Sequence, residues 1–508
     1  MGRARFVAFT VAIVTLAAMG LTDRTGAAES QLVIATGNEV TSLDPHTTDD
    51  TESQNARFMV YETLLRYTGG PQFAPGLATS WTASEGGRKY RFNLRKGVRF
   101  HDGSPFNAEA VKVNLDRLLE PNRDTPAKEY LNAIKSVTVV DDSTVEIELK
   151  EPFAPFLANL ATGPGLMISP EAIKTFGADI SKRAAGTGPF TFVEWVRGDH
   201  LTFAKNRDYW GTPAKVDRVV IRLVPEGAAR VAALRTSEAQ VALRVPPADA
   251  AALQKVSSLR ILRTTTDRSI LFVLNMTKKP FSDIRVRKAI NQAVNRRAIV
   301  DGLMKGAGTV MDGPIAPSVI GSTRLQAYPY DPAGAKQLLA EAGYQQGLTI
   351  SAWCPSGRYV LDKEICEAVQ GQLRNVGIQM DLRIWGDWPA YIGQLFKKLD
   401  ADMAFVGVIT DNHDADTLAT LVMAPGSLFD FGKYKSTVVA EAIKNSRTEL
   451  DPTKRQTYFD EANRAFWNDY PWLALHYQVV FTGIGQSVKD FVFFSNELYD
   501  ARGTSVGQ

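Results

Sequence analysis

The residues best suited to hold a charged solute lie in an acidic segment, TDNHDAD, at 410–416. The apolar run at 403–407 before it predicts a buried strand, so Asp411 would follow the carboxyl end of that strand. Open α/β sheets bind ligands beyond the carboxyl ends of their strands. Asp411 is therefore the candidate for an anion that binds a cationic group. We interpret Asp414 and Asp416 as helix-capping or structural residues.

The candidate cation is Arg358, in the segment PSGRY at 355–359. It lies between a predicted strand and a predicted helix that begins near Leu361. A guanidinium group can form two parallel hydrogen bonds with one carboxylate. Together, Asp411 and Arg358 would supply the opposite charges that a zwitterionic solute requires.

No motif in the sequence indicates bond-making chemistry. We find no GxSxG, no P-loop, no complete GxGxxG after a strand and no zinc-hydrolase motif. The chain has five histidines, none in an HxH or HExxH group, so a metal chelate would depend on His413, with His476 as a second possibility. Residues 411–416 do not form an EF-hand, because glycine is missing at the sixth position and an acidic residue at the twelfth. We expect no catalytic residue, no cofactor and no metal site, and a secreted hydrolase is the weaker alternative.

Short strands and helices alternate along the 508 residues without an internal repeat, which predicts an α/β fold with mixed sheets and two or three domains. In the segment 77–119, Tyr90, Phe92 and Leu94 alternate with polar residues as in a half-buried strand, and Asn107 is a good helix N-cap. Further helices are predicted over 284–304, after Asp331-Pro332 and after Asp451-Pro452.

The first 28 residues have the pattern of a secretory signal: a basic start, an apolar run and small residues before Glu29. Cleavage near Ala28 lowers the net charge from +3 to about +1, which argues against a nucleic-acid partner. In an oxidising compartment, Cys354 and Cys366, the only cysteines, either form a local disulfide or remain two buried thiols.

The chain resembles one protein family in a series of elements that keep their order. Besides 77–119, these are TSLDPH at 41–46, GTGPF at 186–190, NRDYWG at 206–211, RVRKAI at 285–290 and PWLALH at 471–476. The family is the peptide/nickel-type extracytoplasmic solute-binding proteins (family 5) of bacterial ABC importers. The resemblance runs from 41 to 476, nearly the whole mature chain.

The resemblance implies a periplasmic-binding-protein-like fold of type II, of the large peptide-binding class, with two lobes and an extra domain. Carried onto this chain, domain I comprises 29–60, 186–265 and 480–508. Domain II comprises 61–185, and domain III, the ligand lobe, comprises 266–479. Two such lobes enclose a cleft that can close by hinge motion.

The resemblance also implies a function. The chain would be the substrate-binding component of an ABC importer, a periplasmic monomer that captures a peptide or peptide-like solute and delivers it to the inner-membrane permease and its ATPase. Asp411 matches the aspartate that takes the ligand's amino group in dipeptide binders, and Arg358 stands where they carry a carboxylate-binding arginine. A nickel- or metal-chelate binder of the same family is the alternative.

Several positions depart from the dipeptide-binder pattern. His413 stands where glycine is usual, Ala415 where proline is usual, and Val408 where an aromatic residue lies beside the ligand backbone. We expect further ligand contacts at three aromatic residues and at two strand-end residues that would face the cleft. The aromatic residues are Trp385, Trp388 and Tyr391, and the strand-end residues are Asn275 and Tyr477.

Overall fold

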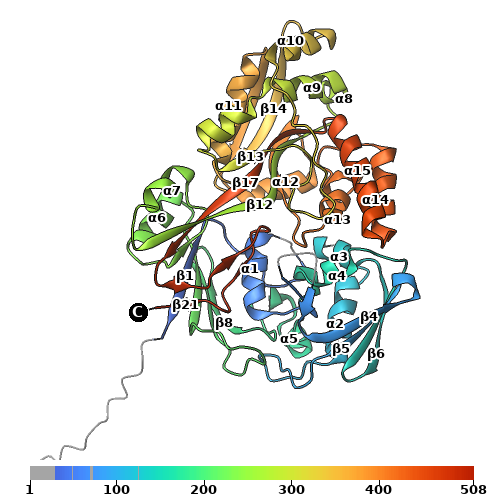
Figure 1. Cartoon of the computed structure of the whole chain (residues 1–508), viewed down its shortest axis with the longest axis vertical. Helices are drawn as coiled ribbons and strands as arrows, with labels where there is room; N and C mark the ends of the chain where they lie inside the picture. The colour runs from blue at the N-terminus through green and yellow to red at the C-terminus, as the bar shows by residue number, and fades with distance from the viewer. Residues whose placement is uncertain (1–28, 48–49, 69–72, 124, 508) are drawn as a thin grey trace, which may run out of the picture.

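The computed structural model describes residues 29–47, 50–68, 73–123 and 125–507. It has two lobes that are joined by two long strands (Figure 1). The predicted signal peptide, residues 1–28, lies outside the described residues. Within the described part of the chain, no helix combines the length and the apolar character needed to cross a bilayer.

One mixed sheet of 11 strands runs through both lobes. Along its main path the order is β15 (Ile378–Trp385), β14 (Leu348–Pro355), β16 (Met403–Val408), β12 (Leu259–Leu274), β17 (Trp472–Gly485), β11 (Val241–Ala242), β1 (Gln31–Thr36), β10 (Arg218–Leu223), β9 (His200–Lys205) and β8 (Phe190–Val196), while β13 (Gly308–Val310) pairs with β17. β14 pairs in parallel with β15 and β16, whereas β12 pairs antiparallel with β16 and β17. The mixed sheet agrees with the predicted fold class.

β12 and β17 have 16 and 14 residues, and they are the strands that connect the lobes. We call the part built from β1–β11, α1–α7 and β18–β21 the first lobe, and the part built from β13–β16 and α8–α15 the second lobe (Figure 1). Every residue of β17 is buried except the last, Gly485, which is half-buried, because the strand lies in the middle of the sheet.

The first lobe carries a second, antiparallel sheet in the order β4 (Ala78–Ser84), β5 (Lys89–Leu94), β7 (Thr144–Leu149) and β6 (Ile134–Asp141). Tyr90, Phe92 and Leu94 are buried on one face of β5, and the Asn107 side chain accepts a hydrogen bond from the Ala110 amide at the start of the next helix, as the sequence predicted. The smaller pairs are β2 (Leu65–Tyr67) with β3 (Phe73–Pro75), β18 (Val488–Lys489) with β21 (Ser505–Val506), and β19 (Val492–Phe493) with β20 (Tyr499–Asp500).

The helices cover the sheets of each lobe. Those of the first lobe are α1 (Thr51–Val60), α2 (Ala108–Leu119), α3 (Pro126–Leu131), α4 (Phe156–Leu160), α5 (Pro170–Phe176), α6 (Gly227–Arg235) and α7 (Pro247–Leu253), with short 3₁₀ turns η1 (Glu85–Gly87), η2 (Gly163–Gly165) and η3 (Gly177–Ser181). Those of the second lobe are α8 (Lys279–Ser282), α9 (Ile284–Ala293), α10 (Pro332–Glu341), α11 (Asp362–Arg374), α12 (Trp388–Lys397), α13 (Ala415–Leu418), α14 (Thr437–Thr448) and α15 (Pro452–Asn468), with π-helical turns η4 (Ala298–Leu303) and η5 (Ala419–Met423).

The predicted starts of α10 and α15 are confirmed, because Asp331 and Asp451 accept hydrogen bonds from the first amides of these helices. The prediction of one helix over 284–304 is wrong. α9 ends at Ala293, and Val294 is extended. The Arg296 guanidinium donates hydrogen bonds to the carbonyls of Asn291 and Val294, so these carbonyls are satisfied without a continuous helix.

The lobes are in close contact in this structure. Leu421 of η5, in the second lobe, belongs to the same apolar cluster as Val111 and Leu115 of α2, in the first lobe. Asn412 donates a hydrogen bond of 2.6 Å to the side-chain oxygen of Asn159, which again joins the two lobes. The space that remains between them is therefore enclosed by both lobes.

Candidate functional site

A cavity of about 480 Å³ lies between the lobes. The first lobe contributes Thr51 at the start of α1 and Tyr130 on α3 to its wall. The second lobe contributes the loop that carries Arg358, one face of α12 and the segment that follows β16, and β12 contributes Arg268. A cavity of this size is in the range of small-molecule sites. Both principal residues predicted from the sequence, Asp411 and Arg358, line it.

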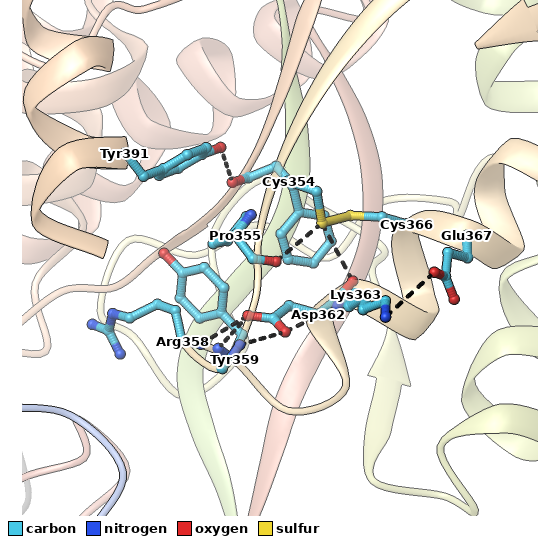
Figure 2. Close-up of a disulfide and its surroundings, with 11 residues drawn as sticks. Cys354, Pro355, Arg358, Tyr359, Asp362, Lys363, Cys366, Glu367 and Tyr391 are labelled. Carbon is cyan, nitrogen blue, oxygen red and sulfur yellow. Dashed lines mark hydrogen bonds and ion pairs between the residues drawn. A yellow bond between two sulfur atoms is a disulfide. The ribbon is translucent and has the colours of Figure 1, made fainter. Parts of the chain in front are cut away.

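The loop that carries Arg358 is fixed at both ends. Cys354 at the end of β14 and Cys366 in α11 form a disulfide, which settles the alternatives left open by the sequence (Figure 2). Within the loop, the Asp362 carboxylate accepts hydrogen bonds from the amides of Gly357, Arg358 and Tyr359 at 2.8–3.0 Å. The Arg358 side chain extends away from Asp362 and the disulfide in Figure 2.

The guanidinium of Arg358 is buried but incompletely paired. Its centre lies 5.1 Å from the ring centroids of both Tyr359 and Trp388. Its Nη1 lies 3.7 Å from Glu52 Oε1, and among the described residues neither Nε nor Nη1 has a hydrogen-bond partner. Only 6% of the residue is exposed. A buried donor without an acceptor is costly, so these two N–H groups favour an incoming anion.

Arg358 adjoins a buried network of charges. Arg244 forms ion pairs with Glu52 at 2.8 Å and with Glu497 at 3.0 Å, and Arg268 forms one with Glu497 at 2.8 Å. Burial alone raises the pKa of Glu52, but Arg358 and Arg244 together lower it to about 2, so this carboxylate is ionised at neutral pH. The network thus has three guanidinium groups and two carboxylates, and it carries a net positive charge.

Asp411 follows β16 and contacts the first lobe. Its Oδ2 accepts hydrogen bonds from Gln54 Nε2 at 2.8 Å and from the Tyr130 hydroxyl at 3.3 Å. Its backbone carbonyl accepts one from Asn496 at 2.9 Å. The residue also lines a second, smaller cavity of about 100 Å³. Asp411 therefore combines exposure to the main cavity with hydrogen bonds between the lobes.

The other acidic residues of the segment are structural, as we expected. Asp414 caps α13 and forms a two-pronged ion pair with Arg455 at 2.6 and 2.7 Å. Asp416 pairs with Arg447 at 3.2 Å. These contacts fix the start of α13, and neither aspartate is in the wall of the main cavity.

His413 lies beside the cavity and does not belong to its wall. Its Nδ1 is 2.7 Å from Asp267 Oδ2, and its ring stacks on Tyr67 with the centroids 4.3 Å apart. Its φ of 54° is in the left-handed region, where glycine is the residue without a steric cost. A glycine, which the resemblance to dipeptide binders implies for this position, would adopt this conformation without strain.

Of the three aromatic candidates, the structure places only Trp388 in the cavity wall. Tyr391 lies behind Trp388, fully buried, and donates a hydrogen bond of 2.7 Å to the Phe405 carbonyl. Trp385 packs against Trp353 with the ring centroids 5.3 Å apart. A buried hydroxyl needs an acceptor, and Tyr391 finds it in the core.

The expectation that Asn275 and Tyr477 face the cleft is wrong. Asn275 donates to the carbonyls of Leu399 and Ala401, and the Tyr477 hydroxyl donates to the carbonyl of Gly313 at 2.9 Å. Both side chains are almost completely buried and neither lines the cavity. Their polar atoms satisfy buried backbone groups, which explains why polar residues occur at these positions.

Sequence reasoning missed most of the cavity wall. Tyr130 lines the cavity, and with Gln54 it donates a hydrogen bond to Asp411; both are remote from Asp411 in the sequence, and no local motif marks them. Ile392 and Phe396 line the cavity one and two turns after Trp388, and their spacing along α12 could have indicated a shared face. Among the described residues, no group of three or more His, Cys, Asp or Glu is arranged to hold a metal ion.

Comparison with known proteins places the chain in a family. Residues 72–427 match the model of "Bacterial extracellular solute-binding proteins, family 5 Middle". The glutathione-binding protein GsiB of Pectobacterium atrosepticum is 32% identical over 481 residues, which cover 93% of each chain. The periplasmic binding protein DppA of Helicobacter pylori, an ABC-transporter-associated protein in complex with the peptide STSA, is 28% identical with a TM-score of 0.87, over 94% of this chain and 99% of that one.

A dipeptide-binding protein from Pseudoalteromonas sp. SM9913 in complex with Met-Leu has a TM-score of 0.88 at 22% identity, over 94% of this chain and 100% of that one, and supports the fold alone. These matches confirm the predicted fold class and the predicted role as the substrate-binding component of an ABC importer, and they do not favour the nickel alternative. The chain therefore belongs to the bacterial extracellular solute-binding proteins, family 5.

Proposed function

We propose that the protein captures a peptide or peptide-like solute in the cavity between its lobes and delivers it to an inner-membrane ABC permease and its ATPase. It works as a monomer in the periplasm, after removal of residues 1–28. The observation that carries the proposal is Arg358, a buried guanidinium whose Nε and Nη1 have no hydrogen-bond partner among the described residues and which lines the cavity.

The two anchors fit the two ends of a peptide. Arg358 would bind the carboxylate through a charge-assisted hydrogen bond from its Nε, which has no hydrogen-bond partner among the described residues. Asp411 would bind the ammonium group, since it already accepts hydrogen bonds from neutral donors and has the charge that a cation requires. Closure of the lobes excludes water and strengthens both interactions.

The names of the relatives agree with this chemistry. Glutathione, in the name of GsiB, and the peptide STSA, in the structure of DppA, both carry amino and carboxylate groups. We propose pure binding, with no bond made or broken, since the two charged anchors hold a solute at its ends.

Calorimetry with a dipeptide and its two blocked forms tests the proposal. Ala-Leu should bind, whereas its C-terminal amide and its N-acetyl form should each bind at least about tenfold more weakly, because each loses a charge-assisted contact of about 1.5–3 kcal/mol. Native mass spectrometry of protein purified from its own periplasm should show a bound solute with both end groups. Equal affinity for Ala-Leu and its amide would refute the role of Arg358, and no binding of any peptide would refute the function.

A further inference from the structure

The main cavity has a charged end and an apolar end. Trp388, Ile392 and Phe396 line it at intervals of four residues, so they lie on one face of α12. Arg358 lies over Trp388, at the start of this face. Because a helix rises 1.5 Å per residue, the face extends about 12 Å from the carboxylate anchor into the cavity.

Three phenylalanines close the apolar end. The ring of Phe396 lies 5.3 Å from that of Phe429 and 5.5 Å from that of Phe431, and all three line the cavity. Although it packs against two aromatic rings, Phe396 keeps 44% of its surface exposed. An apolar group in the cavity would cover the part of this surface that faces the cavity and remove it from water, which is favourable.

The cavity wall offers only one open cation among the described residues. The basic residues in the wall are Arg268 and Arg358. All three nitrogens of Arg268 are engaged, with Glu497, with the Gly407 carbonyl and with the Thr51 hydroxyl. Arg358 keeps an Nε without a hydrogen-bond partner in the described part of the chain, while its Nη1 lies 3.7 Å from Glu52 Oε1. The wall can therefore pair one carboxylate, and a second carboxylate at the apolar end would be buried without a partner, which is costly.

Resting on the proposed function, we infer that the solute is a short peptide with a single carboxylate and a bulky apolar side chain, such as leucine, methionine or phenylalanine. The carboxylate pairs with Arg358, and the apolar side chain lies along α12 against Phe396. Glutathione does not meet this description, because it has two carboxylates and no bulky apolar side chain. The chain thus differs in solute class from its relatives named for glutathione.

Calorimetry on the full mature protein with Ala-Leu, Ala-Ala and glutathione tests the inference. Ala-Leu should bind at least about tenfold more tightly than Ala-Ala, since a single methylene in an apolar pocket is worth about tenfold or more. Glutathione should bind at least about tenfold more weakly than Ala-Leu. Equal affinities for Ala-Leu and Ala-Ala, or glutathione binding as tight as that of Ala-Leu, would overturn the inference and leave the proposed function intact, whereas no binding of any peptide would overturn both.

Variants of Phe396 test whether the apolar side chain of the solute lies against this residue. Phe396→Lys should abolish the preference for Ala-Leu over Ala-Ala, because it places a charge at the apolar end, and Phe396→Leu should keep most of it. Ile284→Lys is the matched control, since Ile284 has the same 44% exposure outside the cavity. Circular dichroism establishes that each variant is folded. A preference that survives in Phe396→Lys would overturn the placement of the side chain.

Discussion

The two anchors of the cavity differ in what surrounds them. The loop that carries Arg358 is held by its own lobe, through the disulfide and Asp362, and the side chain approaches the other lobe only through Nη1, 3.7 Å from Glu52. Asp411 instead accepts hydrogen bonds from Gln54 and Tyr130, which belong to the other lobe. If the proposed function holds, this difference predicts that Arg358 is a rigid ligand anchor, whereas Asp411 connects ligand binding to closure of the lobes.

Replacement of Arg358 should weaken ligand binding the most. Arg358→Ala should weaken binding of Ala-Leu by about 2–5 kcal/mol, because the ligand carboxylate would be buried without its partner. Calorimetry measures this loss. Arg383→Ala is the matched control, since Arg383 also stacks on a tryptophan, Trp385, at 3.8 Å but lies outside the cavity. Equal losses in the two variants would show that arginine–tryptophan packing, and not the cavity, is responsible.

Acid should weaken the network that supports Arg358. The pKa of Glu52 is lowered from 4.5 to about 2 in the folded protein, because Arg358 and Arg244 outweigh the opposing effect of burial. Between these values the unfolded chain binds the extra proton, so stability is complete above pH 4.5 and is lost as pH falls toward 2. The loss from this group is on the order of 3 kcal/mol.

Urea unfolding at pH 5 and pH 3 measures this change. Glu52→Gln should be less stable at pH 5 and should show a smaller decrease between the two values, because it removes the titrating carboxylate. An identical decrease in both proteins would show that Glu52 is not the responsible group.

The disulfide should contribute both to stability and to the position of Arg358. Replacement of Cys354 and Cys366 by serine should lower the free energy of unfolding by about 2–3 kcal/mol, as expected for a short loop. Affinity for Ala-Leu should fall about three- to tenfold, because binding must then order the loop. Denaturant unfolding and calorimetry give the two quantities. Reduced stability with unchanged affinity would separate the disulfide from the anchor.

Replacement of Asp411, which contacts the other lobe, should weaken ligand binding less than replacement of Arg358. Asp411→Asn keeps the shape of the side chain and removes its charge, so affinity for Ala-Leu should fall about 10- to 30-fold, the difference between a charged and a neutral acceptor. X-ray scattering should show a decrease in the radius of gyration when the wild type binds ligand, and a smaller decrease in this variant. Gln54→Ala, which removes the hydrogen bond to Asp411 and leaves its charge in place, should weaken binding less than about threefold. If Asp411→Asn binds and closes like the wild type, the coupling is refuted.

Local patterns in the sequence were sufficient to predict part of the fold and part of the cavity wall. The alternation around Phe92 and the caps at Asp331 and Asp451 depend on neighbouring residues, and the structure confirms them. The contacts of Asp411 come from partners 357 and 281 residues away, which no window of sequence connects. A strand end predicts that a polar residue such as Asn275 needs a partner, but not whether that partner is a ligand or a backbone carbonyl.

The two tryptophans near α12 give the sharpest contrast. Trp388 lines the cavity beneath Arg358, whereas Trp385 packs on Trp353 and Arg383 outside it. Trp388→Ala should weaken binding of Ala-Leu about tenfold, because it removes both apolar contact area and the ring under the guanidinium. Trp385→Ala should change affinity less than twofold, since a side chain that does not touch the ligand acts only through packing. Calorimetry on the two variants, with melting temperatures as a check on folding, decides between them: a larger loss from Trp385→Ala would mean that the ligand lies on the other side of this aromatic cluster.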